Sequence, residues 1–297
     1  MAGLDHGQTE NRSRRRPPRA RAVRVPDLMR RYARFSERAR RDLPCQLGLR
    51  YGTTRAETLD FFPSSAGAPL VVLIHGGFWR RGSAGDISFL ARGPIAAGIA
   101  VAVVDYGLCP TLTIDEITAQ LRNALAWLWR AADVLGFDRH SIVVAGHSAG
   151  AQQVGMLLAT DWASLPGMPA DPIMGAIAVS GIFDLGSLLS GRMRRSLRLT
   201  VATVRRQSPI RHIPASAPPL IVICGREESN EFRRQSQAYF AAWRRRGLRG
   251  KHIERRGGDH FSVFESLSRR NGLLVRHLRS LLGGRDAQVG RAPGMPG

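Results

Sequence analysis

Lysine is almost absent from this chain of 297 residues. Lys251 is the only lysine, so 43 of the 44 basic residues are arginine, and the formal net charge is +21. We interpret the exclusion of lysine as a codon bias, which says nothing about partners. The arginines are spread along the chain, without zinc-finger spacing, a helix-turn-helix signal or a basic strand studded with aromatic residues. Nucleic-acid binding needs basic residues gathered on one face, so we predict no nucleic-acid partner.

Cysteines are few and long apolar runs are missing. Cys45, Cys109 and Cys224 lie far apart, with neither disulfide nor zinc spacing. We therefore predict reduced thiols packed as small apolar side chains, and no metal site. A membrane-spanning helix needs about 18 consecutive apolar residues, and no such run occurs. We expect no membrane partner and a cytoplasmic protein.

Both ends of the chain differ from its middle. Residues 1–24 carry seven arginines and lack the apolar segment of a secretory signal. Nothing in them can be buried to offset the entropy of ordering, so we predict a disordered basic tail. Met29 leaves a misassigned start codon as a rival interpretation. Residues 25–282 are the predicted folded domain, and 283–297 a flexible tail rich in glycine and proline.

Apolar runs alternate with amphipathic segments through the middle of the chain, which predicts a mostly parallel sheet covered by helices on both faces. The least regular part, 185–213, is rich in arginine, and we interpret it as a short insertion over the site. Expected strands are 58–62 (an edge strand), 70–74, 99–104, 142–145, 174–179, 220–224 and 251–254. Expected helices include 86–97, 113–135 with a Thr113/Glu116 capping box, 231–246, and a first helix with Leu28, Tyr32, Phe35 and Ala39 on one face.

The segment from Gly146 to Gly150 reads Gly-His-Ser-Ala-Gly and follows an apolar strand. A Gly-x-Ser-x-Gly between strand and helix is typical of a nucleophile elbow. Its small residues let strand and helix approach closely while the serine backbone is strained. We predict Ser148 as a nucleophile, against the alternative of an ordinary helix-capping serine.

The segment from His75 to Trp79 reads His-Gly-Gly-Phe-Trp and follows another buried strand. Glycines there leave backbone N–H groups open to a developing oxyanion, for which we predict Gly76, Gly77 and Ala149 as donors. A plain glycine turn is the alternative. His75 is expected to brace the loop. Phe78 and Trp79 are predicted to bind substrate as walls of an aromatic pocket, with core packing as the alternative.

The base and the acid of a triad follow later in the chain. Among eight histidines, His260 lies in a Gly-rich loop after the last strand, from which it can reach a serine. His147 adjoins Ser148, and we expect it to pack beneath the elbow. Four carboxylates compete as the residue that orients the base: Glu228, Glu227, Glu231 and Asp184.

Seven stretches carry a resemblance to a known family: His75–Trp79, Asp105–Pro110, Gly146–Ala151, Ser180–Leu185, Ser208-Pro209, Glu231–Ser236 and Asp259–Phe261. Together they resemble the kynurenine formamidase (arylformamidase) branch of the α/β-hydrolases over about residues 27–282. The resemblance implies the α/β-hydrolase fold and a triad of Ser148, Glu228 and His260. The chain departs from the family at two positions. Family members often have aspartate where this chain has Glu228, and often have histidine where it has Gln152.

The resemblance implies hydrolysis of a small acyl amide through an acyl-enzyme, most of all an N-formylkynurenine-like substrate, with no cofactor. The alternatives are a carboxylesterase for small acyl esters and a catalytically idle binding protein with the hydrolase fold. A substrate carboxylate would suit an arginine of the insertion, whereas a solvated basic face is the alternative. The oligomeric state stays open, a homodimer included. The arginines in question are 192, 194, 195, 198, 205 and 206.

Overall fold

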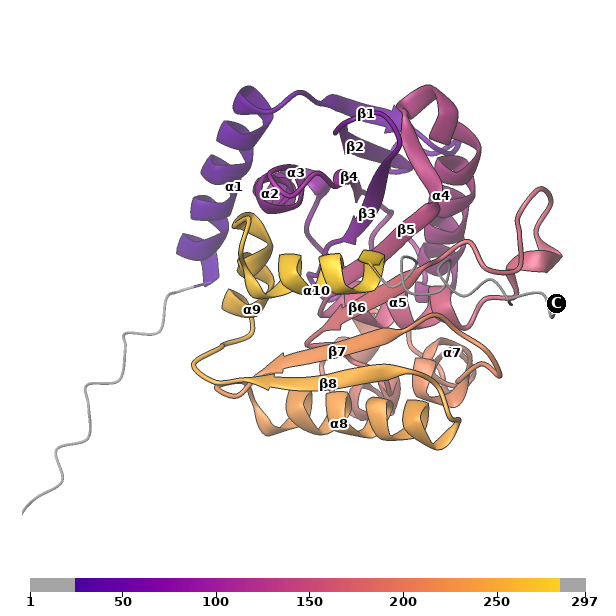
Figure 1. Ribbon diagram of the computed structural model, residues 1–297. Helices are drawn as coiled ribbons and strands as arrows, with labels where there is room; N and C mark the ends of the chain where they lie inside the picture. Colours follow the sequence, from indigo (N-terminus) through magenta and orange to yellow (C-terminus); the bar gives the residue numbers. More distant parts are fainter. Residues whose placement is uncertain (1–24, 284–297) are drawn as a thin grey trace, which may run out of the picture.

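One eight-stranded sheet organises the computed structural model, which describes residues 25–283 (Figure 1). Its strand order is β1-β2-β4-β3-β5-β6-β7-β8. β1 and β2 run antiparallel to their neighbours, and all other pairs are parallel. The predicted tails, 1–24 and 283–297, lie outside the described residues except for Gly283. The strands are β1 Gln46–Arg50, β2 Thr58–Phe62, β3 Ala68–Ile74, β4 Ala100–Val104, β5 Phe137–His147, β6 Gly175–Val179, β7 Leu220–Gly225 and β8 Gly250–Arg255.

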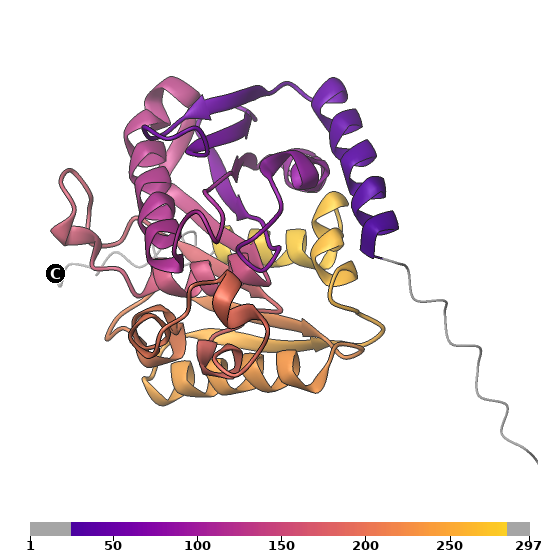
Figure 2. The same ribbon diagram turned by 180° about the vertical axis from the view of Figure 1, so that it is seen from behind.

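Helices cover both faces of the sheet, as the views from front and back show (Figures 1 and 2). One face carries α1 Val25–Asp42, α2 Ala84–Ile87, η1 Ser88–Ala91, α3 Arg92–Ile95, α9 Ser262–Glu265, η5 Ser266–Ser268 and α10 Leu273–Leu282. The other carries α4 Ile114–Leu135, α5 Ala149–Leu158, α7 Val201–Gln207 and α8 Asn230–Arg245, with the short helices η2 Trp162–Ser164, η3 Leu185–Leu188, α6 Met193–Ser196 and η4 Pro209–Arg211 in connections. This arrangement confirms the predicted fold class.

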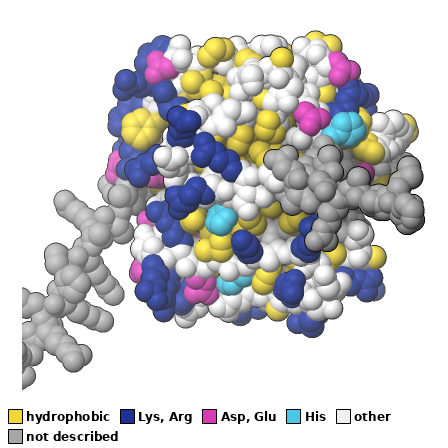
Figure 3. All heavy atoms as spheres, viewed as in Figure 1, with side chains coloured by type: hydrophobic (Ala, Val, Ile, Leu, Met, Phe, Trp, Pro, Cys, Tyr) yellow, Lys and Arg dark blue, Asp and Glu magenta, His cyan; other side chains and the backbone are white. Residues whose placement is uncertain are grey.

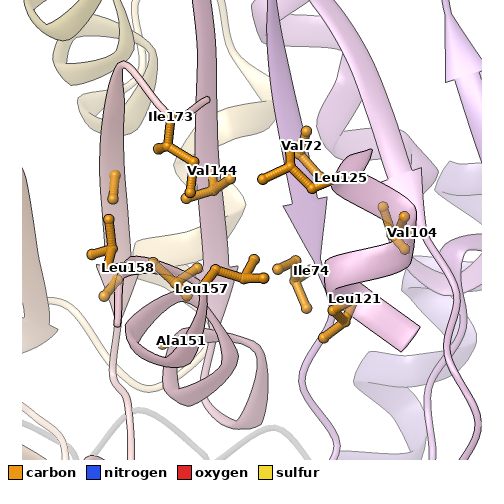
Figure 4. Close-up of a cluster of buried hydrophobic side chains, with 14 of the residues drawn as sticks. Val72, Ile74, Val104, Leu121, Leu125, Val144, Ala151, Leu157, Leu158 and Ile173 are labelled. Carbon is orange, nitrogen blue, oxygen red and sulfur yellow. The ribbon is translucent and has the colours of Figure 1, made fainter. Parts of the chain in front are cut away.

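Strand β3 shows how the sheet builds a core on each side. Successive side chains of a strand point to opposite faces. Leu70, Val72 and Ile74 accordingly pack toward α4 and α5, whereas Val71 and Leu73 pack toward α1 and α10. Figure 4 shows the first of these cores, where β3, β4 and β5 meet α4 and α5. Each such fully buried side chain contributes about 1.5–3 kcal/mol, which holds the strand ends, and the loops after them, in place.

Local sequence signals account for the bounds of the longest helix, α4. Thr113 accepts a hydrogen bond from the Glu116 N–H, and the Glu116 carboxylate accepts one from the Thr113 N–H, so the predicted capping box is confirmed. Gly136 ends the helix in the left-handed conformation, with φ 75°. Glycine adopts that conformation without a Cβ clash.

Three sequence-based expectations about elements were wrong. Strand β2 is not at the edge of the sheet, because β1 pairs with its outer side. Strand β1 was not expected, because its sequence contains Gly48 and exposed polar residues and has no clear strand pattern. The buried face of α1 contains Ser36, and Phe35 is 47% exposed. The helix expected over 86–97 is divided into α2, η1 and α3. Pro94, in the last of these, has no N–H for the hydrogen-bond ladder.

The arginine-rich insertion lies over the strand ends as four short helical pieces, η3, α6, α7 and η4. Its arginines belong to a wider pattern, since Figure 3 shows basic side chains spread from α1 to α8 without one stripe. Among the described helices, none combines the length and the apolar character needed to cross a bilayer.

Candidate active site

Ser148 stands at the sharp turn between β5 and α5. Its φ of 55° and ψ of −114° are strained for a residue with a side chain. Its N–H donates to the Val179 carbonyl on the adjoining strand at 2.8 Å, which holds the turn against the sheet. A Cβ on Gly150 would collide with the Ile74 carbonyl, and one on Gly146 with the Gly150 carbonyl. The turn therefore requires both glycines of the motif.

The Gly76-Gly77 loop lies directly against this turn. A Cβ built on Gly76 would be 3.2 Å from the Ser148 Cβ and 2.9 Å from the His147 carbonyl oxygen. Gly77 has φ 115°, and a Cβ there would strike the Arg81 carbonyl. The N–H groups of Gly76 and Gly77 donate no hydrogen bond to the described residues. Ala149 is the first residue of α5, where the N–H has no partner within the helix.

His75 holds this loop from behind. Its ring stacks on Tyr106 with centroids 4.1 Å apart, and the Tyr106 hydroxyl donates to the His75 carbonyl at 2.8 Å. Burial lowers the pKa of His75 to about 4, so the ring is neutral, and Nδ1–H donates to the Gly76 carbonyl at 2.8 Å. Nε2 is buried and has no hydrogen-bond partner among the described residues. His75 thus has the bracing position that was predicted for it.

Trp79 does not wall a pocket, which corrects the prediction. Its side chain is fully buried, and Nε1–H donates to Gln152 Oε1 at 3.0 Å. Gln152 in turn donates to the Gln207 carbonyl at the end of α7, at 2.8 Å. The apolar ring gains more by core packing than by lining an open site. Phe78, with φ 54°, remains half-buried beside the loop.

Glu228 is the carboxylate that meets His260. The Nδ1–H of His260 donates to Glu228 Oε2 at 2.9 Å. The other oxygen, Oε1, accepts from the Gly225 N–H at 2.5 Å and from the Ser180 hydroxyl at 2.6 Å. The Glu228 side chain is fully buried, whereas that of His260 is 22% exposed. Three hydrogen-bond donors on this buried carboxylate fix its position opposite the His260 ring.

The other candidate acids are held elsewhere. Glu227 is exposed, and Glu231 accepts from Arg234 on its own helix at 2.8 and 2.9 Å. Asp184 caps η3 by accepting from the Gly186 N–H at 2.9 Å. Sequence reasoning missed Ser180, although its segment was among those that carry the family resemblance. Its φ of 53° at the end of β6 directs the hydroxyl to Glu228, and no sequence pattern predicts that angle.

The loop of His260 is fixed against the elbow by His147. His147 Nε2–H donates to the His260 carbonyl at 2.6 Å, and the two ring centroids are 4.6 Å apart. Burial, together with the nearby His260, lowers the pKa of His147 well below its usual value, so it stays neutral. Phe232 of α8 covers His260 at a centroid distance of 4.3 Å. His147 packs beneath the elbow, as expected.

His260 lies beside His147, the residue before Ser148, with ring centroids 4.6 Å apart, but no hydrogen bond joins His260 to Ser148 among the described residues. Catalytic hydrogen bonds are often long before substrate is bound, and tighten in the complex. The oxygen, the imidazole and the free N–H groups lie around one edge of the sheet. Such a set can attack a carbonyl, move a proton and hold the resulting oxyanion.

A cavity of about 810 Å³ opens within the insertion. Four of the six candidate arginines line it, and none of them has a carboxylate within ion-pair distance among the described residues. Arg206, by contrast, pairs with Asp115 at 2.8 Å. Met193, in the same insertion, contacts Arg80 of the oxyanion loop, but no triad candidate lines the cavity. The four lining arginines are Arg192, Arg194, Arg195 and Arg198.

A mostly parallel sheet in this order, with a strained serine after its central strand, defines the α/β-hydrolase class. Residues 61–164 match the family model described as BD-FAE. A kynurenine formamidase from Danio rerio is 32% identical over 256 residues, covering 84% of this chain and 85% of the relative. Given that match, the chain belongs to the kynurenine formamidase family.

Two further relatives widen the comparison. A Silicibacter protein that has been assigned as a thioesterase shares the structure with a TM-score of 0.78 and 29% identity, covering 89% of this chain and 96% of that one. Esterase LipC from Mycobacterium tuberculosis is 27% identical, with 59% of this chain and 49% of the relative aligned. The proteins similar to this chain thus include ones named as amide, ester and thioester hydrolases.

Proposed function

We propose that this chain is a serine hydrolase of the arylformamidase type, acting on N-formylkynurenine or a close analogue. The observation that carries the proposal is the Glu228–His260 hydrogen bond of 2.9 Å, at the edge where the chain turns at Ser148 from β5 into α5. The family relationship adds the amide, since the Danio rerio relative is a kynurenine formamidase. Together with the free backbone N–H groups at this edge, these residues would supply the nucleophile, the base, the acid and the oxyanion donors that acyl transfer needs.

In the proposed reaction, His260 accepts the Ser148 proton as the hydroxyl attacks the formyl carbon. Glu228 holds the imidazole in the tautomer with its proton on Nδ1, which leaves Nε2 free to act as base. The resulting oxyanion receives hydrogen bonds from N–H groups of Gly76 or Gly77 and of Ala149, each worth about 3–4 kcal/mol in such sites.

His260 then gives the proton to the leaving arylamine nitrogen, the C–N bond breaks, and a formyl-enzyme remains on Ser148. A water molecule attacks this ester while His260 again takes the proton. Collapse of the second tetrahedral intermediate returns the proton to Ser148 and releases formate. Atoms balance with one amide and one water consumed for each amine and formate formed.

The arginine-lined cavity supports a substrate that carries a carboxylate. Four guanidinium groups without acidic partners leave a local excess of positive charge. Guanidinium groups bind carboxylates through paired hydrogen bonds, which fix the substrate's orientation as well as its charge. The contact between Met193 and Arg80 brings the insertion near the Gly76-Gly77 loop, which supports a substrate long enough to extend from one to the other.

A carboxylesterase for small acyl esters is the second candidate, and the relationship to Esterase LipC favours it. The two functions share the nucleophile and differ in the leaving group. An arylamine needs protonation as the bond breaks, whereas a phenolate leaves without it.

The test measures kcat/KM for N-formylkynurenine and for p-nitrophenyl acetate, in the wild type and in Ser148→Ala. We expect a preference for the formamide, and a loss of at least about 10⁴-fold in the variant, as for removal of a serine nucleophile. Labelling by a fluorophosphonate probe should disappear in the same variant. Activity on the ester alone would move the chain to the esterases, and an unlabelled wild type would favour an idle binding protein.

A further inference from the structure

Outside the active site, three ligand-type side chains meet under helix α8. Cys224 lies on β7 directly opposite Glu254 on β8. His252 is two residues before Glu254, so it points to the same face of the strand. The ring of Phe240 on α8 stacks over His252 at 5.9 Å, which identifies this face as the one that α8 covers. The strand register alone therefore brings a thiol, an imidazole and a carboxylate together.

The distances suit a small cation. Cys224 Sγ lies 3.9 Å from His252 Nε2, and one atom of each of the three residues lies within 4.8 Å of the other two. Zinc bond lengths and a tetrahedral angle place a sulfur and a nitrogen ligand about 3.6 Å apart. The first pair is thus near its coordinated separation. Glu254 is half-buried and accepts only a hydrogen bond from Gln237 of α8 at 2.6 Å, so its carboxylate can close the remaining gap.

A second observation comes from helix α8. The Ser236 hydroxyl is buried and has no hydrogen-bond partner among the described residues. It lies beside the Cys224 sulfur, close enough to interact with it. An unpaired buried hydroxyl costs free energy unless something bonds it. A water on a bound cation, or the thiolate itself, would supply the missing partner.

We propose that Cys224, His252 and Glu254 bind one Zn²⁺ ion, with water as the fourth ligand. Binding breaks the S–H bond of Cys224 and forms an S–Zn bond, and the proton leaves to solvent. Thiolate, imidazole and carboxylate together are the donor set of zinc, whereas Mg²⁺ and Ca²⁺ prefer oxygen ligands alone. The charge of Arg233, which is close to Cys224, opposes the ion and sets a limit on its affinity.

The site lies behind the proposed triad, not in it. Cys224 immediately precedes Gly225, whose N–H donates to Glu228. The Zn²⁺ site does not depend on the reaction proposed above, because its donors touch neither Ser148 nor His260. The measurement can therefore be made without substrate.

The test is titration of the full-length, reduced protein with Co²⁺, which reports a thiolate ligand by an intense charge-transfer band, followed by displacement with Zn²⁺. We expect a band that saturates at one Co²⁺ per chain and vanishes when Zn²⁺ is added. In Cys224→Ser the band should be lost and the Kd for Zn²⁺ should rise at least about tenfold. His252→Gln, which keeps the thiol, should weaken binding to a similar degree.

Cys109→Ser is the matched control, because Cys109 is also a buried free thiol whose pKa burial raises to about 11. It has no histidine or carboxylate cluster around it in the described residues. We expect it to bind Co²⁺ as the wild type does. If Cys224→Ser fails to fold, His252→Gln and Glu254→Gln decide the matter. An affinity for Co²⁺ that is unchanged in these variants, or the absence of the charge-transfer band from the wild type, would overturn the site.

Discussion

The edge of the sheet that carries the proposed triad and the arginine-rich insertion differ in how firmly their side chains are held. At the edge, the Glu228 carboxylate is fully buried and receives three hydrogen bonds, and the backbone of Ser148 is strained into one geometry. In the insertion, Arg194 and Arg198 are exposed and have no acidic partner among the described residues, and the helical pieces are short.

We propose that this difference separates the chemistry, at the edge, from the choice of substrate, in the insertion. The reacting groups of a serine hydrolase tolerate little displacement, so they rest on strand ends that two cores hold in place. A substrate's outer groups can be met by mobile, solvated side chains, since orientation there needs less precision. We expect substitutions at the edge to change kcat by orders of magnitude, and those in the insertion to change selectivity by about tenfold.

After Ser148→Ala, the largest effect is expected from Glu228→Gln. The amide keeps an oxygen to accept from Gly225 and Ser180, but it presents an N–H₂ group to His260 and so forces the wrong imidazole tautomer. The equivalent change in a serine protease lowers kcat by about 10⁴-fold, and we expect a loss of about 10³–10⁴-fold here with the melting temperature nearly unchanged. Steady-state kinetics on N-formylkynurenine measure it.

Glu227→Gln is the control for that variant, because Glu227 is adjacent in sequence yet exposed. Its activity should equal that of the wild type. Equal losses in the two variants, or none in Glu228→Gln, would break the distinction between fixed edge and solvated surroundings. Asp184→Asn would then be the next variant to examine.

A smaller effect is expected at Asp105, a partly buried carboxylate behind the oxyanion loop. Burial raises its pKa to about 6, although the Ala84 N–H donates to it at 2.6 Å. The pKa is higher in the folded state, so the stability that this group contributes is complete below its ordinary value of 3.8 and is lost as pH rises through about 6. That loss is at most about 3 kcal/mol. In Asp105→Asn this pH-dependent loss should be absent, because asparagine does not ionise. Its side-chain oxygen still accepts from the Ala84 N–H.

Urea unfolding at several pH values checks this expectation. Relative to the wild type, Asp105→Asn should gain stability between pH 4 and 7. Asp115→Asn serves as control, with a side chain 29% exposed against 28% for Asp105. Burial alone would raise the pKa of Asp115, but hydrogen bonds from Arg206 and Gln207 lower it. That variant should therefore lose stability at neutral pH, and a parallel response of the two would contradict the assignment.

The features that could be predicted from the sequence are those that local steric requirements determine. The elbow and the Gly76-Gly77 loop were found because only glycine fits where a Cβ would meet the Ile74 or Arg81 carbonyl. A steric requirement of that kind leaves a motif in the sequence. The apolar strand runs were found because parallel strands are buried on both faces.

The remaining features depend on contacts between distant segments. Four carboxylates were candidates for the triad acid, and composition does not show which one meets His260 or that Ser180 joins it. Trp79 was predicted to wall a pocket, because the sequence does not show whether an aromatic side chain beside a reactive loop faces the substrate or the core. Its partner, Gln152, lies 73 residues away. The domain limits and the oligomeric state remain predictions.

The smallest effect, and the one that sharpens the comparison most, is expected in the insertion. Arg194→Gln and Arg198→Gln should each raise KM for N-formylkynurenine by about tenfold, because a guanidinium–carboxylate hydrogen bond at an open site is worth roughly 1.5 kcal/mol. Hydrolysis of formanilide, which lacks the carboxylate, should stay unchanged in both. Arg205→Gln is the matched control, since Arg205 is exposed in the same insertion but does not line the cavity. If both substrates slow equally, or if Arg205→Gln behaves like the others, the insertion acts through folding or net charge. Selectivity would then have to come from the catalytic edge itself.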